Sequence, residues 1–249
     1  MKETISLLGI PFRPMNICES RRRIAFLLRS SPPAKKIYTP NASILWSASR
    51  SSDLRRLLMQ ADLLLPDGAG VILAAKQKGT PLPERITGID TAEWLLRYGA
   101  KNGFSFYFLG GKPRVAKAAA MQWQQKIPAL RIAGYHHGYF KKTGKENDRV
   151  LAHIQKAKPD ILFVCFGFPE QERWIDRYAH SIPSLHLAMG LGGTLDVWSG
   201  QVKRAPRLVQ TMGLEWLWRT VREPKRIKNL ATLPKFLMAA CKDGKNSDC

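Results

Sequence analysis

The sequence has few cysteines and no long apolar run. Its four cysteines, Cys18, Cys165, Cys241 and Cys249, are scattered without a CxxC pair, which argues against a disulfide framework or a zinc site and favours a reduced, cytoplasmic protein. No stretch approaches eighteen consecutive apolar residues, so no transmembrane helix is expected. The N-terminus also lacks the apolar segment of a signal peptide. Any contact with a membrane is therefore expected to be peripheral.

Common nucleotide-binding signatures are missing as well. The chain has no GxGxxG turn after its first strand, no GxxxxGK[ST] loop, and no DxD pair to hold a metal ion against a nucleotide diphosphate. An oxidoreductase that uses NAD is disfavoured for this reason. His136 and His137 are adjacent, but no HxxxH spacing or acid cluster supports a metal site, so a polar loop is favoured. We expect neither a cofactor nor a metal.

Acidic residues are scarce relative to basic ones. Nineteen Asp and Glu residues face forty Lys and Arg residues, which gives a net charge of +21. Such an excess indicates a polyanionic partner: nucleic acid, an anionic membrane surface or a phosphorylated substrate. A nucleic-acid-binding protein is the main alternative to an enzyme, but no helix-turn-helix, RRM or zinc motif is visible. We therefore expect no nucleic-acid partner.

Seven short apolar segments alternate with helical patterns between Ile5 and about Met189. Most are continuously apolar, as expected for strands that are covered on both faces. This rhythm predicts an α/β fold in residues 1–195, with a doubly wound, mostly parallel, Rossmann-like sheet. In such sheets ligands bind beyond the carboxyl ends of the strands. The expected strands are 5–10, 36–39, 62–65, 104–110, 131–135, 160–167 and 185–190.

Residues 196–249 have a different character. They contain no strand-like run, and from Gly200 onward eleven Lys and Arg residues face four acids. Leu214, Leu217, Trp218 and Val221 recur at helical spacing. The segment is predicted to be a basic helical appendage, and its charge and tryptophans suit the surface of an anionic bilayer.

Asp67 is the first candidate for catalysis. It follows the apolar segment 62–65 and precedes Gly68 and Gly70. Its carboxylate could face a cleft and act as a general base. It could equally cap the helix expected at 68–78. The local sequence leaves these two interpretations balanced.

Two further segments place polar side chains near strand ends. Thr39 and Asn41 follow the strand expected at 36–39, although helix capping alone would explain Asn41. Arg85 is a bidentate donor suited to phosphate or carboxylate. It lies in a polar loop, 79–88, that could form a lid or simply a solvated surface.

Glycine-rich turns follow three other predicted strands, which would let a ligand approach the backbone closely. After 160–167 a helix begins whose free N–H groups could bind an anion, with Gln171 in its first turn. Glu170 and Glu172 are expected to stabilise that helix end electrostatically. The other residues expected near ligand at these turns are Gly110, Gly167, Gly192, Gly193 and Asp196.

Eight segments occur in an order that resembles the WecG/TagA/CpsF family of bacterial glycosyltransferases. They are TPNAS, LPDGAG, ERITGID, FYFLGGKP, GYHHGYF, FGFPEQERW, GLGGTLDVWSGQVKRAPR and GLEWLWRTVREPKR, and the resemblance runs from about Ile5 to Lys228. It implies an inverting, metal-independent enzyme at the inner face of the cytoplasmic membrane. Such an enzyme moves an N-acetylmannosamine-type sugar from a UDP donor to lipid-linked (undecaprenyl) N-acetylglucosamine diphosphate, in the synthesis of teichoic acid or another surface polysaccharide.

The resemblance also implies roles for individual residues. Asp67 would be the general base, Arg85 matches the arginine of the ERxTG loop, and the pocket would be lined by Thr39, Asn41 and Gln171. The resemblance leaves a homo-oligomer open. One departure is the stretch CESRRRIAFLLRS, which is more basic than the family pattern, and another is Glu170, where the family more often has Lys. The arginines expected to neutralise the diphosphate are Arg204, Arg207, Arg219, Arg222 and Arg226.

Overall fold

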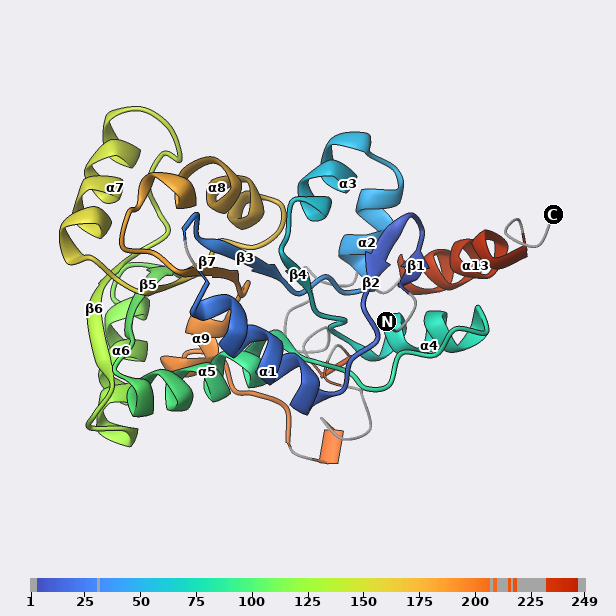
Figure 1. Cartoon of the computed structure of the whole chain (residues 1–249), viewed down its shortest axis with the longest axis horizontal. Helices are drawn as coiled ribbons and strands as arrows, with labels where there is room; N and C mark the ends of the chain where they lie inside the picture. The colour runs from blue at the N-terminus through green and yellow to red at the C-terminus, as the bar shows by residue number, and fades with distance from the viewer. Residues whose placement is uncertain are drawn as a thin grey trace.

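A computed structural model describes residues 4–30, 32–206, 208–209, 215, 217–218 and 232–245 (Figure 1). Its centre is a six-stranded sheet with the strand order β4-β3-β8-β7-β5-β6, in which every neighbouring pair is parallel. The predicted fold class is therefore confirmed. The strands are β3 (Lys35–Tyr38), β4 (Leu63–Leu64), β5 (Ser105–Gly110), β6 (Arg131–His136), β7 (Ile161–Cys165) and β8 (Leu187–Gly190).

The first predicted strand, 5–10, lies outside this sheet. It divides into β1 (Ile5–Leu7) and β2 (Ile10–Phe12), which pair with each other as an antiparallel hairpin. Leu8 and Gly9 form the turn with φ values of 53° and 78°. Positive φ at both central residues is what a two-residue type I′ hairpin turn requires. The continuous apolar run concealed this turn, because leucine seldom adopts such a conformation.

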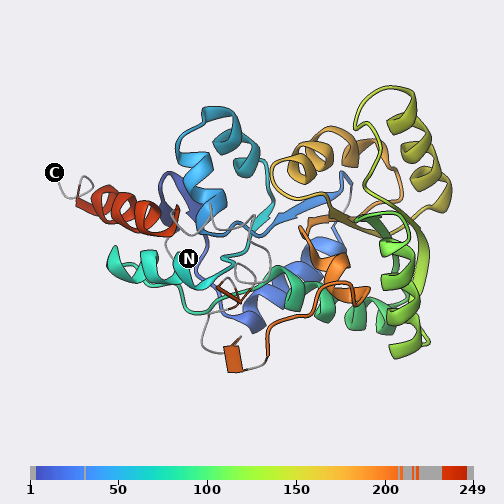
Figure 2. The same cartoon turned by 180° about the vertical axis from the view of Figure 1, so that it is seen from behind.

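Helices cover both faces of the sheet, which explains why its strands are apolar throughout (Figures 1 and 2). On the first face, strand side chains such as Tyr107 and Val164 share a core with α2 (Ala42–Ser49), α3 (Ser52–Met59), α4 (Ala69–Gln77), α7 (Lys145–Ala157), α8 (Glu170–Tyr178), the short η1 (Ala179–Ser181) and α13 (Thr232–Lys245). On the second face, Phe106 and Phe163 share a core with α1 (Ile17–Leu28), α5 (Gly88–Asn102), α6 (Val115–Lys126) and α9 (Thr194–Trp198).

Two helix starts refine the sequence expectations. The pattern from Asn41 to Leu58 predicts one helix, but the structure has two, because Ser51 accepts a hydrogen bond from the Leu54 N–H and begins α3. Thr87, rather than Asp90, is the N-cap of α5. Its side chain accepts a hydrogen bond from the Asp90 N–H at 3.2 Å. This cap fixes the end of α5 that faces the candidate site.

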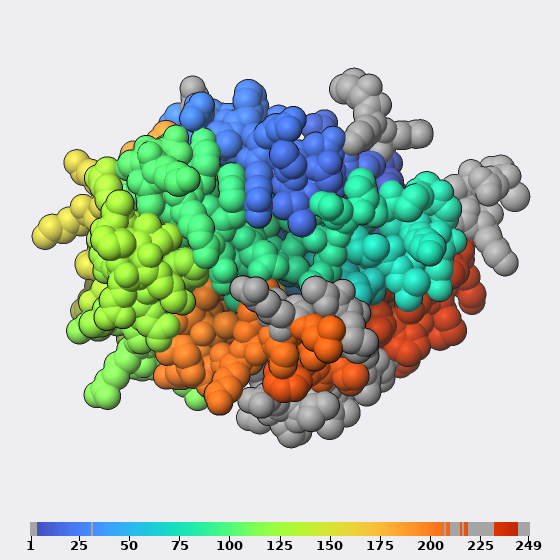
Figure 3. Space-filling model, turned by 90° about the horizontal axis from the view of Figure 1, so that it is seen from below, coloured from blue at the N-terminus to red at the C-terminus, as the bar shows by residue number. Residues whose placement is uncertain are grey.

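The C-terminal helix α13 packs on α2 and α4, and Figure 3 shows it (red) side by side with α4 (teal). Phe236 and Ala240 of α13 are fully buried in the core of the first face. Asp243 pairs with Lys78 at 2.9 Å and accepts a hydrogen bond from the backbone N–H of Leu8. The domain boundary expected between 195 and 196 stays a prediction, but this part of the appendage belongs to the main core.

No helix in the described ranges is both long enough and apolar enough to cross a membrane.

Candidate active site

The carboxyl ends of the parallel strands meet at one edge of the sheet, where the candidate residues gather. After β5, helix α6 connects to β6 at one edge of the sheet. After β7, helix α8 connects to β8, which lies in the opposite direction along the sheet. The helices α6 and α8 lie on opposite faces. The switch in strand order therefore lies between β5 and β7, where open α/β sheets bind ligands. Among the predicted residues, Gly110 ends β5 and Thr39 directly follows β3. Asp67, Gly167 and Gly192 lie within three residues after β4, β7 and β8.

Asp67 directs its carboxylate at the start of α5. Its Oδ2 accepts a hydrogen bond from the backbone N–H of Gly88 at 3.1 Å. The N-cap position of α4 is Gly68, with a φ of 95°, rather than Asp67. The role of Asp67 as general base stays a prediction. The partial positive charge at the start of α5 stabilises a carboxylate in this position.

Thr39 and Asn41 lie beside Asp67. The backbone N–H of Asp67 donates to the Pro40 carbonyl at 3.2 Å, so the ends of β3 and β4 are joined. Thr39 lies against Gly88, where an added Cβ would come within 2.9 Å of the Thr39 hydroxyl. Asn41 caps α2 by accepting from the Ile44 N–H, and its side chain is also the nearest neighbour of Gly68. Asn41 is exposed, so its capping role is compatible with a ligand contact.

The loop that carries Arg85 is exposed at residues 79–81 and 83–84 but is anchored near Arg85. The backbone N–H of Ile86 donates to the Pro66 carbonyl at 3.0 Å, which brings the half-buried Arg85 next to the β4–α4 turn. The carboxylate of Glu84 accepts a 2.6 Å hydrogen bond from the N–H of Ile17, at the start of α1. The loop therefore joins α1 to the turn that presents Asp67.

Gln171 is buried and ties two loops together. Its Oε1 accepts from the N–H of Gly192 at 2.8 Å and from that of Gly167 at 3.2 Å. Its Nε2 donates to Glu172 at 2.8 Å. The side chain thus holds the loops after β7 and β8 in a fixed relation, and these contacts account for both of its amide atoms. The predicted contact with substrate stays a prediction.

Glu172 lies in the first turn of α8, where an acid is expected, but its side chain is buried. No described group donates to its Oε2. Burial raises the pKa of Glu172 to about 7, although the hydrogen bond from Gln171 opposes the rise. The apolar spacing of Trp174 and Ile175 marks the buried face of α8 and could have revealed this.

The crevice between β5 and β7 is narrow. Gly110 has a φ of 143°, and an added Cβ would lie 2.4 Å from the Cys165 carbonyl oxygen, so no larger residue fits. Lys142, which the sequence patterns missed, has its Nζ 4.0 and 4.2 Å from the ring centroids of Phe140 and Phe166. Burial lowers the pKa of Lys142.

Asp196 lies in the first turn of α9. Its carboxylate lies close to Gly193, since a Cβ added at Gly193 would be 3.5 Å from the Asp196 Oδ2. A polar loop is expected at His136 and His137, but His136 is the last residue of β6 and His137 follows it. Their ring centroids are 4.4 Å apart. The described residues contain no group of three or more His, Cys, Asp or Glu arranged to hold a metal ion.

The ordered segments and this edge of polar and glycine residues agree with one family. The model described as "Glycosyl transferase WecG/TagA/CpsF family" matches residues 5–248. The chain belongs to the WecG/TagA/CpsF family of glycosyltransferases.

Curated members of the family cover most of this chain. It is similar to proteins named N-acetylglucosaminyldiphosphoundecaprenol N-acetyl-beta-D-mannosaminyltransferase from three organisms. Identity is 34% for Bacillus subtilis (strain 168), across 84% of this chain and 80% of the relative. It is 35% for Bacillus spizizenii, across 83% and 78%, and 32% for Staphylococcus aureus (strain MW2), across 96% and 92%.

Among the appendage arginines of this WecG/TagA/CpsF chain, the structure describes Arg204. Its Nη2 lies 2.6 Å from Asp90 of α5, and its other nitrogens lie 3.7 Å from Glu93 and 3.6 Å from Glu215. Burial opposes its charge, yet these carboxylates raise the pKa of Arg204. The guanidinium thereby anchors the segment after α9 to α5, and its predicted contact with a diphosphate stays a prediction. Arg207, Arg219, Arg222 and Arg226 lie outside the described residues.

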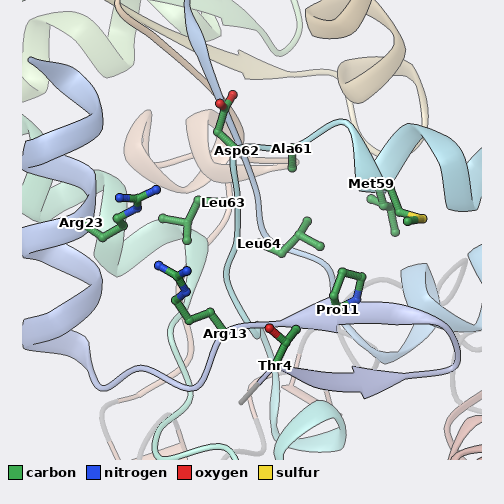
Figure 4. Close-up of a pocket in the computed structure, with 10 residues that line it drawn as sticks. Thr4, Pro11, Arg13, Arg23, Met59, Ala61, Asp62, Leu63 and Leu64 are labelled. Carbon is green, nitrogen blue, oxygen red and sulfur yellow. The ribbon is translucent and has the colours of Figure 1, made fainter. Parts of the chain in front are cut away.

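A pocket of about 200 Å³ lies elsewhere in the family fold (Figure 4). It is lined by residues 61–64, which lead into β4, whereas Asp67 follows that strand. The pocket is therefore at the amino end of β4, and the candidate site is at its carboxyl end.

Proposed function

We propose that this glycosyltransferase moves an N-acetylmannosamine-type sugar from a UDP donor to lipid-linked (undecaprenyl) N-acetylglucosamine diphosphate at the inner face of the cytoplasmic membrane. The observation that carries the proposal is the carboxylate of Asp67, held by the Gly88 N–H beside Thr39 and the loop of Arg85. The names of the relatives support the acceptor and the sugar.

In the proposed step, Asp67 is the general base. The acceptor hydroxyl oxygen forms a bond to the anomeric carbon of the sugar as its proton passes to the Asp67 carboxylate. The bond between that carbon and the UDP oxygen breaks at the same time, and its electron pair leaves with UDP. Attack on the face opposite the leaving group inverts the anomeric centre. A single carboxylate suffices for such an inversion, so a second catalytic acid is not required.

The departing UDP needs positive charge or hydrogen-bond donors around its diphosphate. Arg85 beside the β4–α4 turn and the partial positive charge at the start of α8 are suited to this task. We propose that Arg207, Arg219, Arg222 and Arg226 of the appendage complete the set. Because arginines supply the charge, the proposed reaction uses no metal and no cofactor.

The position of the switch point suggests how the donor lies along the edge of the sheet. A nucleotide in the crevice between β5 and β7 would direct its sugar across β8 and β3 toward Asp67. Three strand spacings, about 14 Å, separate β7 from β4. The loops tied by Gln171 lie along this path.

A transfer assay with several UDP-sugars and a synthetic lipid-diphosphate acceptor tests the proposal. We expect the highest rate with UDP-N-acetylmannosamine and an unchanged rate after chelation of metal ions. UDP should raise the melting temperature, whereas NAD and duplex DNA should not. Stabilisation by NAD alone, with no sugar transferred, would contradict the proposed function.

A further inference from the structure

The N-terminal helix α1 carries more positive charge than its fold requires. It contains three consecutive arginines, and Arg29 is its C-cap. Its one acid, Glu19, is occupied in the capping box with Asn16. We call the exposed residues Arg21, Arg22, Phe26 and Arg29 the α1 arginine face.

Two arginines of the α1 arginine face contact an aromatic ring and a hydroxyl. Arg21 lies over the ring of Trp94, 5.7 Å from its centroid, and Arg29 donates to the Tyr98 hydroxyl at 3.2 Å. Within the part of the chain that the structure describes, no carboxylate forms an ion pair with any of its three arginines. The side chain of Phe26, which belongs to the same face, is 62% exposed.

Among the other described arginines, Arg56, Arg97, Arg173 and Arg204 each pair with a carboxylate. Arg50, Arg131 and Arg177 instead contact an aromatic ring or a backbone carbonyl. What distinguishes α1 is that three exposed arginines and an exposed aromatic ring lie on one helix. An unpaired cluster beside an exposed aromatic ring is suited to an anionic bilayer, since the charges attract lipid phosphates and the ring enters the interface.

The pocket at the amino end of β4 adjoins this helix. Figure 4 shows Arg23 of α1 and Arg13, which follows β2, extending toward the same space beside Leu63. Leu58 and Leu64 add an apolar lining. The one carboxylate in the lining, Asp62, accepts a hydrogen bond from the Lys36 N–H at 2.8 Å and lies 4.0 Å from Lys35. Two arginines over an apolar floor fit a phosphate that is attached to a lipid.

We propose that the α1 arginine face is a docking surface for an anionic phospholipid bilayer, with a lipid phosphate held between Arg13 and Arg23. The inference rests on the proposed function for its lipid-linked acceptor. The start of α1 is joined to the loop of Arg85 through Ile17 and Glu84. A bilayer on α1 would therefore lie next to the loop whose Arg85 is proposed to stabilise the UDP diphosphate. The lipid-linked acceptor would enter the site there.

Vesicle binding of the full chain tests this surface. The variant Arg21→Gln/Arg22→Gln/Arg29→Gln is compared with Lys141→Gln/Lys145→Gln/Arg149→Gln, which removes three exposed charges at and before α7, on the opposite face of the sheet. On vesicles of phosphatidylglycerol and phosphatidylcholine, the α1 variant should bind about 100-fold more weakly, roughly fivefold per arginine, and the control variant far less weakly. On phosphatidylcholine alone, all three proteins should bind weakly.

Equal losses of vesicle binding in both variants would show that only net charge matters and would overturn the proposal. Unchanged vesicle binding of the α1 variant would also overturn it. Binding of the same proteins to RNA is measured in parallel. If the α1 variant lost binding to RNA but kept its binding to vesicles, the bilayer would be overturned as the partner of this surface. Arg13→Gln/Arg23→Gln should weaken vesicle binding by about 25-fold. Unchanged binding of this variant would show that the pocket is not part of the docking surface.

The transfer reaction separates this inference from the proposed function. With a short, water-soluble acceptor the α1 variant should match the wild type, and with an acceptor embedded in vesicles it should be slower. Equal rates on the embedded acceptor would overturn the docking surface alone. Absence of transfer by the wild type on either acceptor would overturn the proposed function and leave the vesicle result standing.

Discussion

The Asp67 carboxylate and the Gly88 N–H are joined by a 3.1 Å hydrogen bond that links the end of β4 to the start of α5. Asp67→Asn keeps an oxygen that can accept this bond but cannot take a proton. We expect turnover to fall about 100-fold or more, with a nearly unchanged melting temperature. Asp67→Ala should lose the same activity and also melt earlier, because the Gly88 N–H loses its partner. Turnover of Asp67→Asn within tenfold of wild type would place the base elsewhere.

Removal of the Gln171 side chain should loosen both loops that it joins. Gln171→Ala leaves the N–H groups of Gly167 and Gly192 without their acceptor. We expect about 2–4 kcal/mol lower stability and a higher KM for the donor. Gln125→Ala, at an exposed position of α6, is the matched control. Unchanged stability with a raised KM would instead indicate that Gln171 contacts substrate directly.

The buried carboxyl of Glu172 should make stability depend on pH. Its pKa is about 7 in the folded chain against an ordinary value of 4.5. The unfolded chain therefore loses this proton first as pH rises, and stability falls across the range from about 4.5 to 7. Glu172→Gln removes that loss, so it should stabilise the protein by roughly 3 kcal/mol at pH 8 and little at pH 4.5. Thermal melts across this range, with the exposed Glu170→Gln as control, check the prediction. Parallel curves for wild type and Glu172→Gln would contradict it.

Arg204 is expected to anchor the appendage to α5. Arg204→Gln leaves Asp90, Glu93 and Glu215 without their shared cation and should lower the free energy of unfolding by about 1–2 kcal/mol. Adding Asp90→Asn should restore part of that loss, since the two residues are coupled. The control is Arg97→Gln, which removes a more exposed partner of Glu93. A rise in the KM for the donor without a change in stability would instead favour the predicted diphosphate contact.

Much of the sheet could be predicted from the sequence, because strands buried on both faces must be apolar throughout. The segments that became β3 to β8 agree with the expected ones to within a few residues. The hairpin at Leu8 and the break at Ser51 could not be seen, since each depends on a local conformation inside an otherwise regular pattern. The strand order was not predicted either, because it depends on contacts between segments far apart in the chain.

The candidate site was predictable as a set of positions but not as a set of contacts. Strand ends and the family resemblance gave Asp67, Thr39 and Arg85. The Gly88 N–H that binds the Asp67 carboxylate is a backbone group, which no residue pattern reveals. The burial of Glu172 and the anchoring of Arg204 result from the packing of α8 and from the pairing of Arg204 with α5.

The hydrogen bond from Leu8 to Asp243 spans 235 residues. During synthesis the N-terminal hairpin, α2 and α4 leave the ribosome long before α13 is made, so the apolar surface that receives Phe236 stays open until α13 follows. This part of the core therefore closes later than the sheet that it covers. A nascent chain that already displays α1 could reach the bilayer before its catalytic core is finished.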